Sequence, residues 1–104
     1  MIYLLHYEDV IGDPQNPRGQ AQHYMGYADD GRLEERIEEH RRGQGAAITR
    51  AFAERGIAFV VAACWPGDRS KERRLKRWHK HRQLCPICRQ QAMRGESEYV
   101  QLHP

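Results

Sequence analysis

Cysteines are few in this sequence, and long apolar runs are missing. The 104 residues include three cysteines, an odd number that does not fit the fully paired disulfide framework of small secreted proteins. No apolar run approaches the length needed to span a membrane. Residues 1–6 become polar too early for a signal peptide. We therefore expect a single cytoplasmic domain with one core.

Acidic residues are nearly absent from residues 69–94. This block holds ten Lys or Arg and the single acid Glu72, a net charge of +9. Residues 1–68 hold seven basic and eleven acidic residues, a net charge of −4. Such a block favours a polyanionic partner, and it favours DNA over a membrane because no large apolar helix face adjoins it. RNA is an alternative, and so is a solvated basic helix without a partner.

Hydrophobic periodicity and turn residues predict an α+β fold with the element order β-β-α-α-β-α. The expected elements are strands at 2–7 and 23–28, helices at 33–42 and 46–55, a strand at 57–65, and a helix at 70–82 with Ser70 as its cap. The apolar run 57–65 is expected to be a buried strand with Cys64 in the core. We expect one domain at 1–94 and a polar tail at 95–104.

The helix expected at 33–42 has unusual residues on its inner face. Leu33 and Ile37 mark its apolar side. Arg36 and His40 fall on that same side, one helical turn apart, although the other faces of the helix are strongly acidic. A guanidinium and an imidazole beside apolar contacts indicate a functional role for this face.

Glu72 is placed in a similarly unusual way on the helix expected at 70–82. It shares one face with Leu75, Trp78 and His79, so the only acid of the basic block lies on an apolar stripe. A lone carboxylate in that position is costly unless a cation or hydrogen bonds satisfy it. Two interpretations remain open, an ion pair with a neighbouring basic residue and a metal ligand.

Two cysteines in a Cys-Pro-Ile-Cys turn at residues 85–88 suggest a zinc site. Cys85 and Cys88 have the spacing of a zinc-binding pair, and His79 and His81 could complete a set of four ligands. The second cysteine pair of a zinc ribbon or RING domain is absent. A packed thiol turn is therefore the alternative.

Several short motifs in this chain order resemble the GIY-YIG nuclease superfamily, over roughly residues 1–85. The matching residues are Met1-Ile2-Tyr3, Tyr24-Met25-Gly26, Arg36 with His40, Gly45-Ala46, Thr49-Arg50, and Glu72. The first two correspond to the two signatures that name the family, and the glycine and Thr-Arg segments resemble its structure-specific branch. The resemblance implies a small three-stranded antiparallel sheet flanked by helices.

The resemblance also implies an activity, the hydrolysis of DNA phosphodiester bonds by a divalent-metal-dependent endonuclease that makes single-strand incisions. Glu72 would hold one Mg²⁺ or Mn²⁺ ion, and Arg36 would grip the scissile phosphate. Tyr3 would position or deprotonate the attacking water, with Tyr24 and His40 completing the hydrogen-bonded set. Positive charge from Arg36 and a metal-bound water is expected to lower the pKa of Tyr3.

Basic side chains are expected to bind backbone phosphates on either side of the cut. The candidates are Lys71, Arg73, Arg74, Lys76, Arg77, Lys80 and Arg82 in the basic block, with Arg41, Arg42 and Arg50 as an extension. We expect no separate DNA-reading domain in these 104 residues, which suggests structure-directed or weakly specific cutting, or targeting through a protein partner.

Two other functions remain open. One is a catalytically inactive nucleic-acid-binding module of the same fold. Tyr27 stands where many family members have a basic residue, and the only asparagine of the chain is Asn16, far from the position where the family often has one. The other is a small zinc-dependent interaction protein built around the cysteine pair.

Overall fold

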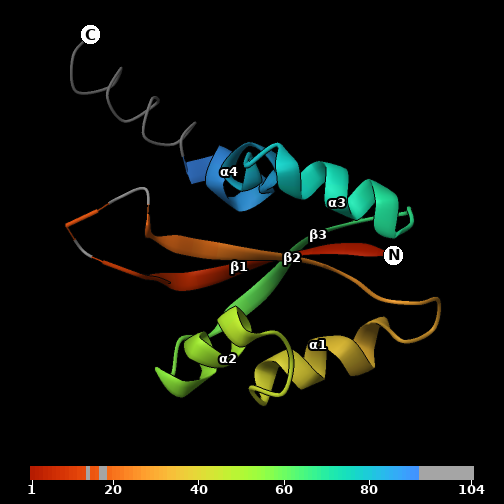
Figure 1. The fold of residues 1–104 in the computed structure, drawn as a ribbon. Coiled ribbons are helices and arrows are strands. Elements are labelled where there is room, and N and C mark those ends of the chain that lie inside the picture. Colours follow the sequence, from red (N-terminus) through yellow and green to blue (C-terminus); the bar gives the residue numbers. More distant parts are fainter. Residues whose placement is uncertain (14, 17–18, 92–104) are drawn as a thin grey trace, which may run out of the picture.

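The protein consists of a central sheet between two layers of helices, as the computed structural model shows for residues 1–13, 15–16 and 19–91 (Figure 1). The elements in chain order are β1 (Ile2–Ile11), β2 (Ala21–Tyr27), α1 (Leu33–Arg41), α2 (Ala47–Glu54), β3 (Phe59–Trp65), α3 (Arg69–Arg77) and α4 (His81–Leu84). This order confirms the predicted α+β fold. Residues 86–91 are also helical, whereas the tail predicted at 95–104 lies outside the described residues.

The three strands form an antiparallel sheet in the order β2-β1-β3, as expected. β1 is central, and its residues 2–7 are all buried. In the pairing of β1 with β2, Tyr3 lies opposite Gly26 and His6 lies opposite His23. β1 continues to Ile11 and β2 begins at Ala21, so the connection between these strands is shorter than the one implied by the strands expected at 2–7 and 23–28. The two strands are prolonged beyond a register shift between His6 and Ile11.

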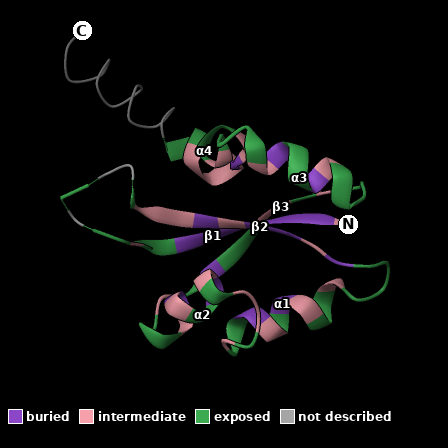
Figure 2. Ribbon diagram, in the orientation of Figure 1, coloured by how far each residue is buried: buried purple, intermediate pink, exposed green. Residues whose placement is uncertain are grey.

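The alternation of side chains along β1 creates two cores, one on each face of the sheet. Tyr3, Leu5 and Tyr7 face α1 and α2, and the Tyr7 ring stacks on Phe52 with 3.6 Å between centroids. The opposite face packs against α3 and the chain that follows it, through the buried residues Ile2, Leu4, Met25, Leu75 and Cys85. The buried positions in Figure 2 accordingly concentrate on β1 and on the inner sides of the helices.

The prediction of a buried third strand was wrong for most of β3. Phe59 is buried, but Val60 and Val61 are 48% and 39% exposed, and Cys64 is exposed. The reason lies in the sheet order: β3 is an edge strand, and α3 packs on β2 at the other edge. A run of apolar residues indicates a strand, but it does not indicate where that strand lies in the sheet or whether helices cover it.

The third predicted helix was too long, and its cap was misplaced. Asp68 caps α3 by accepting a hydrogen bond from the Lys71 amide at 2.9 Å, so Ser70 is not the cap. The helix ends at Arg77, and His79 has a φ of 50°, which breaks the helix before α4. Trp78 is therefore 55% exposed and does not continue the stripe of Glu72 and Leu75. Within the described residues, no helix has the length and apolar character needed to cross a bilayer.

Candidate active site and candidate metal centre

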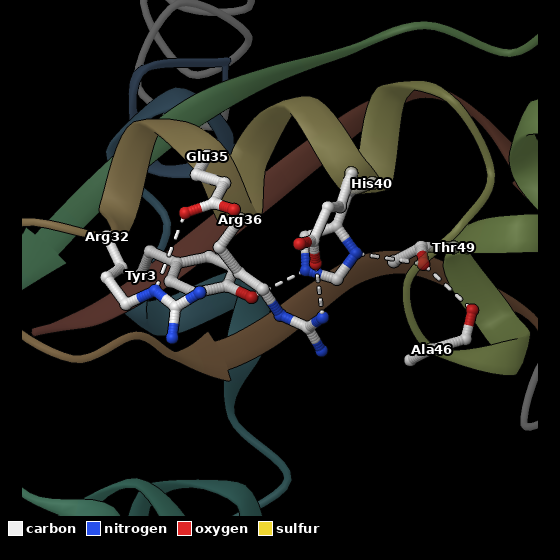
Figure 3. A network of polar contacts seen from close by, with 8 residues as sticks. Tyr3, Arg32, Glu35, Arg36, His40, Ala46 and Thr49 are labelled. Atoms are coloured by element: carbon white, nitrogen blue, oxygen red, sulfur yellow. Dashed lines mark hydrogen bonds and ion pairs between the residues drawn. The ribbon is translucent and has the colours of Figure 1, made fainter.

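A line of buried polar side chains runs from β1 through α1 to α2 (Figure 3). The Tyr3 hydroxyl lies 2.5 Å from His40 Nε2, and His40 Nδ1 lies 3.0 Å from Thr49 Oγ1. Thr49 donates its own proton to the Ala46 carbonyl at 2.8 Å. Because that proton is committed, His40 Nδ1 must donate to Thr49, and His40 Nε2 is left to accept the proton of Tyr3. These hydrogen bonds therefore select one tautomer of His40, with the proton on Nδ1.

The charge state of His40 suits this role. Burial, followed by the charge of Arg36, lowers the pKa of His40 to about 4. The imidazole is therefore neutral near pH 7, and its Nε2 lone pair faces the Tyr3 hydroxyl. A buried neutral imidazole of this kind can receive a proton from the tyrosine.

Two glycines make room for this pair. A Cβ on Gly26 would overlap the hydroxyl of Tyr3, and a Cβ on Gly45 would overlap Nδ1 of His40. Gly26 stands directly opposite Tyr3 in the sheet, so the absence of its side chain lets the tyrosine ring lie across β2. The packing of Tyr3 therefore requires a glycine at position 26, and the packing of His40 requires a glycine at position 45.

A cleft of about 490 Å³ lies beside β2, with α1 on one side and α3 on the other. Its lining residues are Tyr24, Gly26, Tyr27, Ala28 and Asp29 from β2 and the turn after it, Arg32, Glu35, Arg36 and Glu39 from α1 and its cap, and Arg69, Glu72 and Lys76 from α3. Three of the five residues expected at a catalytic site, Tyr24, Arg36 and Glu72, thus line one cavity. Tyr3 and His40 do not line it, and both are buried directly behind it, with Tyr3 0% exposed.

Glu72 reaches this cleft from α3 and is only 8% exposed. Its Oε1 lies 2.7 Å from Nζ of Lys76, one turn further along the helix, so the ion pair left open by the sequence is present. The same ammonium lies 5.3 Å from the ring centroid of Tyr24. Glu72 and Lys76 therefore form a pair at the cleft wall.

Arg36 joins the cleft to the buried tyrosine. Its Nη1 donates to Glu39 Oε2 at 2.8 Å, and its guanidinium is near enough to the Tyr3 hydroxyl to favour the phenolate. Burial, followed by the neighbouring Tyr24, raises the pKa of Tyr3, and Arg36 offsets this only in part. The positive charge of Arg36 alone therefore does not lower the pKa of Tyr3, because desolvation of the phenolate outweighs it. The expected contribution of a metal-bound water stays a prediction. Tyr3 is a neutral phenol whose proton is directed to His40.

Arg69 was not among the residues singled out from the sequence. Its guanidinium lies over the Tyr27 ring, 5.5 Å from the centroid, and both residues line the cleft. A positive charge from α3 thus lies next to Tyr27 in the cleft. Sequence spacing gives no signal for this contact, since the two residues are brought together by the packing of α3 beside β2.

The predicted phosphate-binding residues fall into two groups. Those of the basic block lie on α3 or just after it, with Arg73, Arg74 and Arg77 exposed along the helix. Lys71 is instead directed to the Pro66 carbonyl at 3.1 Å. The remaining candidates, Arg41, Arg42 and Arg50, lie on α1 and α2 or next to them, and these helices cover the opposite face of the sheet (Figure 1). They are therefore not continuous with the basic surface of α3.

A second group of polar residues lies on the α3 side of the sheet. His6 of β1, His23 of β2, and Cys85 and Cys88 after α4 place one potential ligand atom each within 4.8 Å of all the others. His6, His23 and Cys85 are buried, and Cys88 is half-buried. This group could hold a metal ion, and its two thiols and two imidazoles resemble the ligands of zinc more than those of Mg²⁺ or Mn²⁺.

The sequence analysis singled out the two cysteines of this group but not its two histidines. His79 is exposed, and His81 packs near the His23 ring without joining the group. His6 and His23 were missed because they lie far from the cysteines in the chain. A signal was available: once Tyr3 is placed opposite Gly26, antiparallel pairing sets His6 opposite His23, on the other face of the sheet from Tyr3.

No family model, curated protein or solved structure matches this chain. The inference of function therefore rests on the residues of the cleft and of the His–Cys group.

Proposed function

We propose that the protein is a divalent-metal-dependent endonuclease that hydrolyses phosphodiester bonds of DNA in the cleft beside β2. The observation that carries the proposal is the convergence of Tyr24, Arg36 and Glu72 on one cavity, with the Tyr3–His40 pair directly behind it. These residues come from three separate parts of the chain. They are also the residues that the GIY-YIG resemblance selected from the sequence alone.

Glu72 fits the task of holding one Mg²⁺ or Mn²⁺ ion. Its carboxylate is buried at the wall of the cleft and already has a cation, Lys76, against Oε1. A hard divalent ion is commonly held by one or two carboxylates together with water and phosphate oxygens. Such an ion would stabilise charge on the phosphate in the transition state and on the departing 3′ oxygen.

Basic groups of the cleft would bind and orient the substrate. Arg36 presents a planar guanidinium for the scissile phosphate, and its closeness to Tyr3 would place that phosphate near the tyrosine. Arg69 and Lys76 line the same cavity from α3 and would contact neighbouring phosphates. Such contacts position the backbone without reading its sequence, which agrees with cutting that is directed by DNA structure or only weakly specific.

The buried hydrogen bonds provide a route for the proton of the attacking water. As water attacks the phosphorus, its proton would pass to the Tyr3 oxygen while the proton of Tyr3 passes to His40 Nε2. The water must enter beside Gly26, which lines the cleft and abuts the Tyr3 hydroxyl. The bond between phosphorus and the 3′ oxygen would break, and the departing 3′ oxygen would take up a proton from solvent, which gives a 5′-phosphate and a 3′-hydroxyl. His40 would return its proton to solvent afterwards. Tyr3 is thus a proton relay, and His40 is the final base.

The His–Cys group would have no part in this chemistry. Its thiols and imidazoles suit Zn²⁺, whereas the catalytic ion is expected on oxygen ligands at Glu72. The proposed enzyme would therefore carry two metal sites with separate tasks.

A catalytically inactive DNA-binding module is the second candidate, and two contacts favour it. Lys76 occupies one oxygen of Glu72, and Glu39 occupies one nitrogen of Arg36. In an inactive module these ion pairs would persist when DNA is bound. In a nuclease the metal ion would displace Lys76, and the phosphate would compete with Glu39.

Incision of DNA decides between the two candidates. Supercoiled plasmid and branched DNA are incubated with Mg²⁺ or Mn²⁺ and with wild type, Glu72→Ala or Glu38→Ala. Glu38 is a matched control because it is an exposed acid outside the cleft. We expect nicking by wild type and Glu38→Ala, and loss of nicking in Glu72→Ala.

Two results would contradict the proposal. Wild-type protein that binds DNA but leaves it intact with either metal would support the inactive module. Glu72→Ala nicking at the wild-type rate would mean that the site has been assigned wrongly. A parallel series with RNA hairpins tests the alternative substrate.

A further inference from the structure

The contacts around His6 Nδ1 are not explained by hydrogen bonding. Three atoms lie against this one nitrogen, His23 Nε2 at 3.1 Å, Cys85 Sγ at 3.5 Å and Cys88 Sγ at 3.6 Å. Cys88 Sγ is also 3.3 Å from His23 Nε2. A ring nitrogen carries either one proton or one lone pair, so hydrogen bonds cannot satisfy all three neighbours. A cation between the four atoms would satisfy them together.

The separations match those of tetrahedral zinc. Zinc binds imidazole nitrogen at about 2.0–2.1 Å and thiolate sulfur at about 2.3 Å. A tetrahedron with these bond lengths separates two nitrogens by about 3.3 Å and a nitrogen from a sulfur by about 3.6 Å. The corresponding distances here are 3.1 Å between the two nitrogens and 3.3 to 3.6 Å between nitrogen and sulfur. The agreement is within a few tenths of an ångström for these four pairs, and all six pairs of ligand atoms lie within 4.8 Å.

We propose that His6, His23, Cys85 and Cys88 form a closed structural zinc site that fastens the chain after α3 onto the sheet. The site is closed because four protein ligands complete a tetrahedron and leave no position for substrate or water. Binding would release the two thiol protons to solvent as the thiolates coordinate the ion. Thiolate ligands also select against Mg²⁺ and Mn²⁺, which prefer oxygen.

The chain after α3 has little else to hold it. Among residues 78–91, Cys85 is the one residue that is buried, and α4 contributes no buried residue. Apart from Cys85, the hydrophobic contacts of this segment come from the partly buried side chains Leu84, Ile87 and Cys88. A short helical segment of this kind is marginal without an added constraint. A metal bond to two strands of the sheet supplies that constraint.

The proposed zinc site is independent of the proposed nuclease activity. The His–Cys group lies on the α3 side of the sheet, whereas Tyr3 and His40 lie on the α1 side. Its tests use metal content and local stability, so they can succeed or fail whatever happens in the incision assay.

Metal analysis of the purified full chain is the first test. We expect one zinc ion per chain. Replacement of zinc by Co²⁺ should give the intense visible bands of tetrahedral cobalt and a thiolate-to-cobalt charge-transfer band. Cys88→Ser and His23→Asn should each weaken Co²⁺ binding by at least about tenfold. The matched controls Cys64→Ser and His79→Asn should bind like wild type, because neither residue belongs to the group.

Three results would overturn the assignment. They are wild-type protein that binds neither metal, Co²⁺ bound with an octahedral spectrum and no thiolate band, and Cys88→Ser that binds as tightly as wild type. Since wild type alone decides the first two, a variant that fails to fold does not leave the proposal untested.

Hydrogen exchange tests the fastening role. The wild-type protein is compared with zinc bound and after removal of zinc by a chelator. We expect amides of residues 81–91 to lose protection without the metal, while amides of α1 and α2 keep theirs. Unchanged exchange in 81–91 after complete removal of the metal would overturn the proposed role.

Discussion

Thr49→Val removes the hydroxyl that accepts a hydrogen bond from His40 in the buried network of Tyr3, His40 and Thr49. Thr49 is fully buried, and valine has nearly the same shape, so the change creates no cavity. The Ala46 carbonyl loses the threonine proton but keeps the Arg50 amide at 3.0 Å. His40 Nδ1, in contrast, loses its acceptor. The substitution therefore isolates the link between Thr49 and His40.

The expected cost follows from the burial of His40, which is 1% exposed. An unpaired buried donor costs about 1–3 kcal/mol. The ring could instead adopt the other tautomer, but Nε2 would then carry the proton and could no longer accept from Tyr3. Either way one buried polar group is left unpaired. We expect a loss of about 1–3 kcal/mol in the free energy of unfolding, and a fall in incision rate of about tenfold or more.

Thr49→Ser is the control that separates stability from the proton route. Serine keeps the hydroxyl and removes one methyl group, which costs about 1 kcal/mol of burial. It should therefore lose stability while keeping most of the wild-type incision rate. Urea unfolding followed by circular dichroism and single-turnover nicking measure the two quantities. Thr49→Val with wild-type stability and a wild-type rate would refute the proposed hydrogen-bond order.

Two further predictions concern pH and salt. Because the folded protein lowers the pKa of His40 from its ordinary 6.5 to about 4, the unfolded chain binds the extra proton between these values. Stability from His40 is therefore complete above pH 6.5 and falls by up to about 3 kcal/mol as the pH drops to 4. Urea unfolding should show a shallower decline over this range for His40→Asn than for wild type, and parallel curves would contradict the stated cause. Replacing Arg73 and Arg77 together by alanine should weaken DNA binding and reduce the slope of log affinity against log salt by up to about 1.8. An unchanged slope, equal to that of an Arg55→Ala control, would show that the exposed edge of α3 does not meet the DNA backbone.

Local patterns in the sequence were sufficient for most of the fold. Helical spacing placed Ile37 and His40 on the buried side of α1, as the structure confirms. Turn residues and apolar periodicity gave the element order, because each depends on neighbours within one helix or strand. Helical spacing also identified Arg36 and Glu72 as polar residues on inner helix faces, and both line the cleft.

The features that were missed depend on how distant segments pack. The exposure of Val60 and Val61 follows from the edge position of β3, which no local pattern encodes. His6 and His23 required the register of β1 against β2, and their approach to Cys85 required the break at His79 that turns the chain back. The pKa of Tyr3 depends on the balance between burial and Arg36, and only the structure shows that burial prevails.

Hydrolysis by water in the Glu72 cleft is tested most directly by the chemistry of the cut ends. Supercoiled and branched DNA are incubated with wild-type protein and Mn²⁺ in ¹⁸O-labelled water, and any new ends are analysed by mass spectrometry. We predict one ¹⁸O atom in the 5′-phosphate and an unlabelled 3′-hydroxyl. Intact DNA, a strand linked covalently to tyrosine, or label on the 3′ side would contradict it.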